Sequence, residues 1–475
     1  MKTSDYEVWA KRAAEWGQRY LDGLPDKPVR AQTAPGKIAR ALPEAPPEAP
    51  EAMEAIFEDF ERLVPGGLTH WQHPRFFAYF PANAAPASMI AEQLVSVMAA
   101  QCMLWQTAPV ATEMETRMGE WMRTALGLPS HFASVIQDSA TSATLSAVLT
   151  MRERALGWRG LEEGWSGAPR LRVYASAQTH SSVDKAIRIA GIGQNNLVKI
   201  PTDADYAMDA AALRRQIAED RAAGVSPAGV VLCIGGTSIG ASDRPAEILD
   251  VAAEEGLYTH VDAAWAGAAM ICPEFRAIWE GVHRADSIVM NPHKWLGAQF
   301  DCSLQFLADP EPQVRTLGLR PDYLQTLGQD DVVNYNEWTV PLGRRFRALK
   351  LWFLMRAYGL EGLRARIRNH VAWAEELEAK FRADPDFEIV TGCRLSLFTF
   401  QYAPRGVRAD GAEAVDAATR ALLERINDDG RTYLTQTMHE GRFVIRVQVG
   451  PFDCARDDVL AVYDIAKDVA GGGVQ

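Results

Sequence analysis

A lysine that directly follows a short apolar run is the first residue of this sequence that could do chemistry. Residues 287–290 (SIVM) are typical of a buried strand, and Asn-Pro-His-Lys-Trp at 291–295 comes straight after them. Open α/β sheets bind their ligands at the carboxyl ends of strands. The amine of Lys294 could therefore form a Schiff base with a carbonyl compound. The alternative is an ordinary surface lysine, because most lysines lie in solvent.

Three more polar groups follow predicted strands or begin a predicted helix. Asp262 ends a short apolar run, His180 follows the run at 171–175, and small hydroxyl residues at 139–144 precede a long helix. A helix start presents free N–H groups to an anion, although simple N-capping uses the same residue types. An amine, a carboxylate, a flat ring and a phosphate cup are the parts that a pyridine aldehyde phosphate needs.

The elements that position these groups alternate between strands and helices. Strand-like runs are separated by helical stretches such as 209–222 and 245–255, and the runs lie at 171–175, 229–234, 259–261 and 287–290. This alternation predicts a mostly parallel sheet. From about Arg345 the pattern changes to helices and strands of a smaller α+β domain, with helices at 346–358, 370–381, 412–427 and 457–469 and strands at 396–402 and 442–449.

We therefore expect three domains: an N-terminal helical segment at 1–85, a large α/β domain at 86–345 and a small C-terminal α+β domain at 346–475. A helix capped by Ser4 or Asp5 carries Trp9, Trp16 and Tyr20 on one face. A proline-rich stretch follows, so this helix cannot bury its apolar face alone. We expect it to pack on a second subunit, or alternatively on its own large domain. A final run of glycines at 471–473 is typical of a frayed tail.

Composition excludes several classes of protein. The chain has 475 residues, 48% hydrophobic, and a formal net charge of −12, which argues against a nucleic-acid surface. Its 6 cysteines are scattered without metal-ligand spacing, so we expect reduced thiols and no metal site. The N-terminus lacks the apolar segment of a signal peptide, and no stretch is apolar enough for a membrane span. These features predict a cytoplasmic protein with no membrane partner.

The motifs together resemble the pyridoxal-phosphate-dependent group II amino acid decarboxylases, above all the aromatic-L-amino-acid decarboxylases. The resemblance covers nearly the whole chain. Its strongest motifs are HVDAAWAG at 260–267 and NPHKW at 291–295, and it also includes FFAYFP at 76–81, THSSVDKA at 179–186, ICPEFR at 271–276 and PLGRRFRALKLWF at 341–353. The resemblance implies a fold-type I transferase-like α/β fold, pyridoxal 5′-phosphate as the cofactor, and a homodimer.

By resemblance, Lys294 would hold the cofactor as a Schiff base, Asp262 would pair with the pyridinium nitrogen, and His180 would stack on the ring. The phosphate would meet the helix start and the segment before the lysine, and the remaining cofactor contacts implied are Ser139, Ala140, Thr141, Thr237, Ala264, Asn291 and His293.

Tyr335 decides the reaction outcome in this resemblance. It lies in the polar stretch 328–338, which in the family looks like a mobile loop that closes over the site. Its hydroxyl would protonate the substrate carbon after CO2 leaves, whereas relatives with phenylalanine here are oxygen-consuming aldehyde synthases. Because the chain keeps both Tyr335 and His180, simple decarboxylation is favoured.

The substrate contacts transfer less directly. The implied positions are Trp71, Phe80, Pro81, Ala82, Met103 and Gly343. Several depart from the animal enzymes, for example Ala82 in place of a threonine. Gly343 matches plant relatives that accept indoles, since a missing side chain leaves room for a bicyclic ring. We therefore expect tryptophan or 5-hydroxytryptophan, with tyrosine, dopa and phenylalanine next. The alternatives are an aldehyde synthase, a decarboxylase for a non-aromatic acid, and a cofactor-binding dimer without catalysis.

Overall fold

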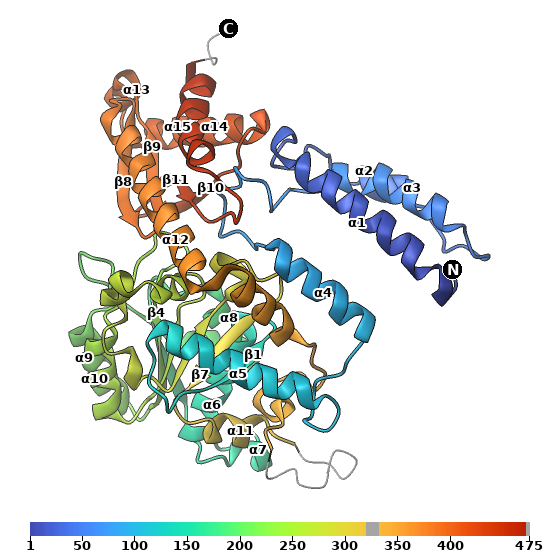
Figure 1. Ribbon diagram of the computed structural model, residues 1–475. Coiled ribbons are helices and arrows are strands. Elements are labelled where there is room, and N and C mark those ends of the chain that lie inside the picture. The colour runs from blue at the N-terminus through green and yellow to red at the C-terminus, as the bar shows by residue number, and fades with distance from the viewer. Residues whose placement is uncertain (320–331, 472–475) are drawn as a thin grey trace. The chain divides into compact units, whose positions relative to one another are not determined.

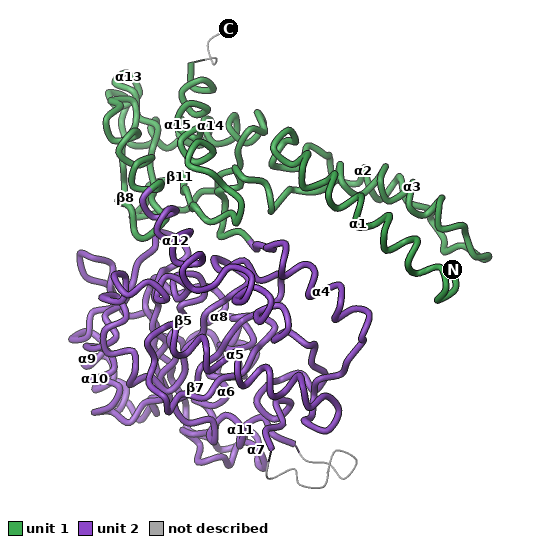
Figure 2. Tube along the Cα trace, viewed as in Figure 1, with its two compact units in different colours: residues 1–81, 373–475 green, residues 82–372 purple. Residues whose placement is uncertain are grey.

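The computed structural model describes residues 1–319 and 332–471, which form two compact units. The sheet unit contains residues 82–372, and the terminal unit contains residues 1–81 together with 373–475 (Figure 2). The division into three domains stays a prediction, because these units group residues by their contacts alone. The glycine tail expected at 471–473 lies outside the described residues beyond Gly471.

The sheet unit is built on a seven-stranded sheet with the order β1-β7-β6-β5-β4-β2-β3 (Figure 1). Neighbouring strands from β6 through β5, β4 and β2 to β3 are parallel, whereas β7 runs antiparallel to β6 and β1. The predicted mostly parallel α/β fold is therefore confirmed. The strands are β1 (Ala133–Gln137), β2 (Leu171–Ser176), β3 (Leu197–Ile200), β4 (Ser226–Cys233), β5 (Tyr258–Asp262), β6 (Ser287–Met290) and β7 (Ser303–Leu307).

Burial explains why the central strands read as continuous apolar runs. Every residue of β5 and β6 is buried, as expected for parallel strands that helices cover on both faces. The helices of this unit are α4 (Pro86–Met98), α5 (Pro109–Leu126), α6 (Ala140–Ala155), α7 (Gly160–Glu163), α8 (Ser181–Ile189), α9 (Ala210–Ala222), α10 (Pro245–Glu255), α11 (Glu311–Leu317) and the first part of α12 (Arg347–Ala383). Gly359 interrupts α12 with φ 61° and ψ 166°, where the sequence predicts a longer gap between two helices.

The terminal unit has its own antiparallel sheet and core. The strand order is β10-β11-β9-β8, and Phe381, Phe398 and Phe400 lie at the centre of the packing. The elements are α13 (Arg405–Ala409), α14 (Ala412–Asp429), α15 (Arg456–Gly471), β8 (Phe387–Arg394), β9 (Leu397–Tyr402), β10 (Thr435–His439) and β11 (Arg442–Gln448). Strands β8 and β10 are absent from the prediction.

The same unit includes α1 (Tyr6–Asp22), α2 (Lys37–Ala41) and α3 (Met53–Leu63). Trp16 of α1 packs edge-on against Phe60 of α3, with ring centroids 4.7 Å apart. Neither α1 nor α3 contains a buried residue. The N-cap residue of α1 is Asp5, one of the two predicted, although its carboxylate accepts a hydrogen bond from the Lys2 N–H and makes no side-chain bond to the start of α1. Within the described ranges, no helix is long and apolar enough to cross a membrane.

Candidate active site

Four strand ends and two helix starts of the sheet unit surround a pocket that contains Lys294. We call it the lysine pocket. It brings together side chains that are far apart in the sequence, and its lining consists of Ser139, Ala140, Thr141, His180, Ser182, Cys233, Gly235, Thr237, Asp262, Ala264, Trp265, Asn291, His293, Lys294 and Phe300. All ten of the residues expected to contact a cofactor are among them.

Lys294 lies in a wide helical turn, Pro292–Leu296, that follows β6 directly. Wide turns of this kind are rare and frequently occur at functional sites. The Lys294 N–H donates to the Asn291 carbonyl at 3.0 Å, which turns the chain sharply at the strand end. Burial lowers the pKa of the Lys294 ammonium, and the charge of Asp262 opposes that shift. A lowered pKa increases the fraction of neutral amine, which is the nucleophilic form.

Asp262 and His180 supply a carboxylate and an aromatic ring to the same pocket. Asp262 is the last residue of β5 and is 6% exposed. His180 is the N-cap of α8, and its Nδ1 accepts a hydrogen bond from the Ser182 backbone N–H at 3.1 Å. The neutral ring therefore carries its proton on Nε2. Burial lowers the pKa of His180, which favours this neutral ring.

The start of α6 and the segment before Lys294 provide hydrogen-bond donors. Ser139 is the N-cap of α6, and its hydroxyl accepts a hydrogen bond from the Ser142 N–H at 3.1 Å. This hydroxyl therefore caps the helix, as the alternative interpretation of the sequence expects. The N–H groups of the first helical turn remain suited to an anion. Nδ1 of His293 accepts from the Cys302 N–H at 2.9 Å, which leaves Nε2 as its donor. Burial lowers the pKa of His293 to about 3.

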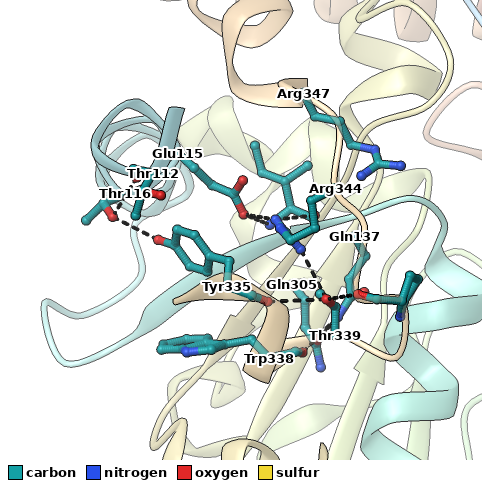
Figure 3. Close-up of polar contacts among 12 residues, drawn as sticks. Thr112, Glu115, Thr116, Gln137, Gln305, Tyr335, Trp338, Thr339, Arg344 and Arg347 are labelled. Atoms are coloured by element: carbon teal, nitrogen blue, oxygen red, sulfur yellow. Dashed lines mark hydrogen bonds and ion pairs between the residues drawn. The ribbon is translucent and has the colours of Figure 1, made fainter. Parts of the chain in front are cut away.

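Tyr335 begins a short helical turn, Tyr335–Trp338, that lies against α5 (Figure 3). Its hydroxyl lies 2.9 Å from the hydroxyl of Thr116, and the Arg344 guanidinium lies 5.3 Å from the centre of its ring. Burial raises the pKa of the Tyr335 hydroxyl. Among the described residues, the lining of the lysine pocket does not include Tyr335. Residues 328–331 of its expected loop lie outside the described residues.

Comparison with known proteins identifies the family. The pyridoxal-dependent decarboxylase conserved domain matches residues 35–403. The chain belongs to this family. The aromatic-L-amino-acid decarboxylase of Rattus norvegicus is 37% identical over 489 residues, which cover 99% of this chain and 98% of that protein. The phenylacetaldehyde synthase of Arabidopsis thaliana is also 37% identical, with 91% and 89% covered.

Solved structures agree with this assignment. The crystal structure of Oryza sativa TDC with PLP and tryptamine matches with a TM-score of 0.96 at 34% identity, covering 100% of this chain and 99% of that one. The chain is therefore a pyridoxal-phosphate-dependent carboxy-lyase of the aromatic amino acid decarboxylase family.

The residues of the lysine pocket fit the cofactor of the family. Lys294 offers an amine for an aldehyde, Asp262 offers a carboxylate for a ring nitrogen, and the first turn of α6 offers N–H groups for a phosphate. The side-chain Oδ1 of Asn291 is buried and has no hydrogen-bond partner within the described part of the chain. A buried polar atom of this kind indicates a ligand at that place.

The expected substrate contacts of this decarboxylase are divided between its units. Trp71, Phe80 and Pro81 belong to the terminal unit, and Ala82, Met103 and Gly343 belong to the sheet unit. Trp71 is 39% exposed and stacks on Phe76 with centroids 4.6 Å apart. Among the described residues, the lining of the lysine pocket does not include Ala82, Met103 or Gly343. Their contact with a substrate therefore stays a prediction.

Sequence reasoning missed five residues of the lining, namely Ser182, Cys233, Gly235, Trp265 and Phe300. Two of them carry a signal that was available. Cys233 ends β4, and residues at the carboxyl ends of parallel strands face ligands. Gly235 has φ 76°, and a Cβ there would lie 2.4 Å from the Cβ of Ala266, so the position requires glycine.

Proposed function

We propose that this decarboxylase converts an aromatic L-amino acid to the corresponding arylalkylamine and CO2. Tryptophan and 5-hydroxytryptophan are the favoured substrates, followed by tyrosine, dopa and phenylalanine. The observation that carries the choice of decarboxylation is the tyrosine at position 335 in a chain whose lysine pocket keeps His180. The choice of an indole rests on Gly343, where a missing side chain leaves room for a larger ring.

The residues of the chain divide the chemistry among themselves. When bound, pyridoxal 5′-phosphate supplies the electron sink that accepts the electrons of the broken carbon–carboxylate bond. Lys294 provides the amine that receives the aldehyde. Asp262 keeps a proton on the ring nitrogen, and His180 presents the flat face of its neutral ring. The N–H groups of α6 orient the phosphate, and this fixed orientation supplies much of the rate enhancement.

Tyr335 completes the reaction by giving its proton to the substrate carbon after CO2 leaves. Burial raises its pKa, so the hydroxyl keeps its proton until a sufficiently basic carbon is presented. Because Tyr335 bonds Thr116 and is 3% exposed, its side chain must leave this position to reach a substrate. A closing loop of the kind that the family resemblance implies would supply this movement.

An aldehyde synthase is the main alternative, because a relative of that activity is as similar as a decarboxylase relative. Overall identity therefore does not distinguish the two reactions, whereas the residue at 335 does so by resemblance. A decarboxylase for glutamate would need cations beside the segment 76–81, where only Arg75 is present in the sequence. A cofactor-binding dimer without catalysis would need a defect in the lysine pocket.

The test is product analysis by mass spectrometry in one reaction. The purified protein with added pyridoxal phosphate is incubated with equal amounts of tryptophan, 5-hydroxytryptophan, tyrosine, dopa, phenylalanine, histidine and glutamate. We expect tryptamine and 5-hydroxytryptamine in excess over the other amines. Phenethylamine-type amines in excess would remove the role of Gly343 but keep the reaction. Aldehydes would contradict the role of Tyr335, and the absence of any aromatic product would refute the proposal.

We also propose that the protein acts as a homodimer. Apolar residues of the N-terminal helices lack cover in the single chain, with Val8 66% and Ile56 44% exposed. Helix α4 likewise exposes Ile90 by 50% and Val97 by 60%. Exposed large apolar side chains gathered on a helix are typical of protein interfaces. Light scattering of the purified holoenzyme is expected to give twice the chain mass, and a stable, active monomer would refute the dimer.

A further inference from the structure

Asn83 contacts the turn that carries Lys294, although no sequence signal assigns it a role. Its side-chain Nδ2 donates a hydrogen bond to the main-chain carbonyl of Lys294 at 2.9 Å. Its backbone N–H donates to the carbonyl of His293 at 3.1 Å. The residue is 1% exposed, so water does not compete for either bond. Asn83 is thus bonded to the two residues that enter the lysine pocket at this turn.

The segment that begins at Asn83 runs along the whole lysine turn. Two residues further on, the Ala85 N–H donates to the Gly297 carbonyl at 2.8 Å and fixes the far end of the turn. The bond from Asn83 Nδ2 to Lys294 uses a side chain, whereas the bonds from the Asn83 and Ala85 N–H groups use the main chain. It is therefore the contact that depends on residue type, since any residue except proline supplies the other two.

The bond is important because the turn itself holds the Lys294 carbonyl weakly. The donor within the turn is the Gly297 N–H at a longer 3.3 Å. A wide turn lacks the regular ladder that fixes a residue in an α-helix. Without the amide of Asn83, the Lys294 carbonyl keeps this longer bond, so the peptide after Lys294 and the start of the lysine side chain are held less firmly.

We propose that Asn83 is a positioning residue for Lys294, holding its main chain so that the amine meets the cofactor in the reactive orientation. The inference rests on the proposed function, in which Lys294 receives the cofactor aldehyde. Asn83 touches neither substrate nor cofactor in this account. It directly follows Ala82, an expected substrate contact, so one residue connects that position with Lys294.

Asn83→Ala removes the donor, and Asn427→Ala is the matched control. Asn427 is a buried asparagine of the terminal unit whose Nδ2 also donates to a carbonyl, that of Leu434, at 3.1 Å. Asn427→Ala removes two hydrogen bonds, since the Oδ1 of Asn427 also accepts from the Leu434 N–H at 3.0 Å, but only Asn83→Ala changes the lysine turn. Each variant is prepared as the holoenzyme, and three quantities are compared with the parent: the pH midpoint of the cofactor–lysine absorbance, the rate at which hydroxylamine displaces the lysine, and kcat against KM.

For Asn83→Ala we expect a shifted absorbance midpoint, at least a threefold change in the hydroxylamine rate, and a roughly tenfold lower kcat with little change in KM, because a small misplacement of a reacting group costs rate steeply. Asn427→Ala is expected to lower the melting temperature and to leave all three quantities unchanged. If Asn83→Ala does not fold, Asn83→Ser takes its place under the same criteria.

The proposal would be overturned if the Asn83 variant had the same absorbance midpoint, hydroxylamine rate and kcat as the parent protein. It would also be overturned if the Asn427 variant changed these quantities as much as the Asn83 variant. The parent protein separates this result from a failure of the proposed function. If borohydride reduction does not attach the cofactor to Lys294 in the parent, the function assigned to Lys294 fails, and the inference about Asn83 fails with it.

Discussion

The hydroxyl of Tyr335 lies 2.9 Å from the hydroxyl of Thr116, and both residues belong to the sheet unit (Figure 3). The Thr339 hydroxyl donates to the Tyr335 carbonyl at 3.2 Å, and the Arg344 guanidinium covers the ring. The tyrosine expected to donate the final proton is thus fixed at its hydroxyl, its ring and its main chain. This arrangement allows the loss of the hydrogen bond to be separated from the loss of the proton.

Tyr335→Phe and Thr116→Val form a matched pair, because each removes the same hydrogen bond while only the first removes the phenol. We expect Tyr335→Phe to lower amine formation by about 10²–10⁴-fold, the usual contribution of a positioned acid. Oxygen then reacts in place of the proton, so aldehyde, ammonia and hydrogen peroxide should appear. Thr116→Val should keep the amine as the main product. Peroxide assays and mass spectrometry measure the ratio, and a Tyr335→Phe variant that still makes only amine would refute the assigned role.

The neighbouring arginines Arg344 and Arg345 make ion pairs in opposite surroundings. Arg344 is 4% exposed and pairs with the buried Glu115, whose Oε1 also accepts from the Ile136 N–H at 2.8 Å. Arg345 pairs with Glu92 at the surface, with its side chain 51% exposed. Because Arg344→Ala leaves a buried carboxylate without its partner, it should lower the free energy of unfolding by about 3–5 kcal/mol. Arg345→Ala should cost about 1 kcal/mol or less. Urea denaturation measures both, and equal losses would contradict the expectation.

Stability should depend on pH through buried neutral histidines, and His370 is the one best suited to a test. Its Nδ1 accepts a hydrogen bond from Trp295 Nε1 at 2.9 Å, and burial lowers its pKa from the ordinary 6.5 to about 3. Between these values the unfolded chain binds a proton that the folded chain does not bind. The contribution of His370 is therefore complete above pH 6.5 and is lost progressively as the pH falls towards 3.

The measurement is the free energy of unfolding at pH 7, 6 and 5. His370→Asn keeps an acceptor for Trp295 and should make the decline between pH 6 and 5 shallower by about 1 kcal/mol per pH unit. His283 supplies the control, since water reaches its ring in the folded protein. An unchanged decline in the His370 variant would show that this ring is not kept neutral by burial.

Gly343 tests the expected preference for indoles. A Cβ at this position would lie 3.3 Å from Gln101 Nε2, the end of a flexible side chain, so serine should be accommodated by a small shift. We expect Gly343→Ser to lower the ratio of kcat/KM for tryptophan over tyrosine by about tenfold, the effect of a few added atoms in a pocket. Gly406→Ser in the terminal unit, where a Cβ would meet nothing within 4 Å, should leave the ratio unchanged. A constant ratio in both variants would remove the role of Gly343.

The parts of the site that were predictable follow directly from local sequence. Asp262 and Lys294 come straight after buried apolar runs, and Ser139 begins a long helix, so their placement at one edge of the sheet follows from strand direction alone. The family motifs then added Thr237 and Ala264, which carry no chemical signal of their own.

Other features depend on contacts between distant segments. The bond from Asn83 to Lys294 joins positions 211 residues apart, and nothing in either segment indicates the approach. Strand β7 alternates polar and apolar residues, yet all five are buried. Gln305 is satisfied inside by Gln137 and Gln313, so its burial requires a polar layer that a local pattern does not reveal.

The most direct test of the account is a balance of gases and products with the preferred substrate. Holoenzyme and L-tryptophan are held in a closed cell while CO2 release, oxygen uptake, tryptamine and peroxide are followed together. We predict one tryptamine for each CO2, with no oxygen uptake and no peroxide above the control without enzyme. Oxygen uptake equal to CO2 release, with indole acetaldehyde as the product, would contradict the assignment of proton delivery to Tyr335, and the absence of CO2 would contradict the proposed substrate.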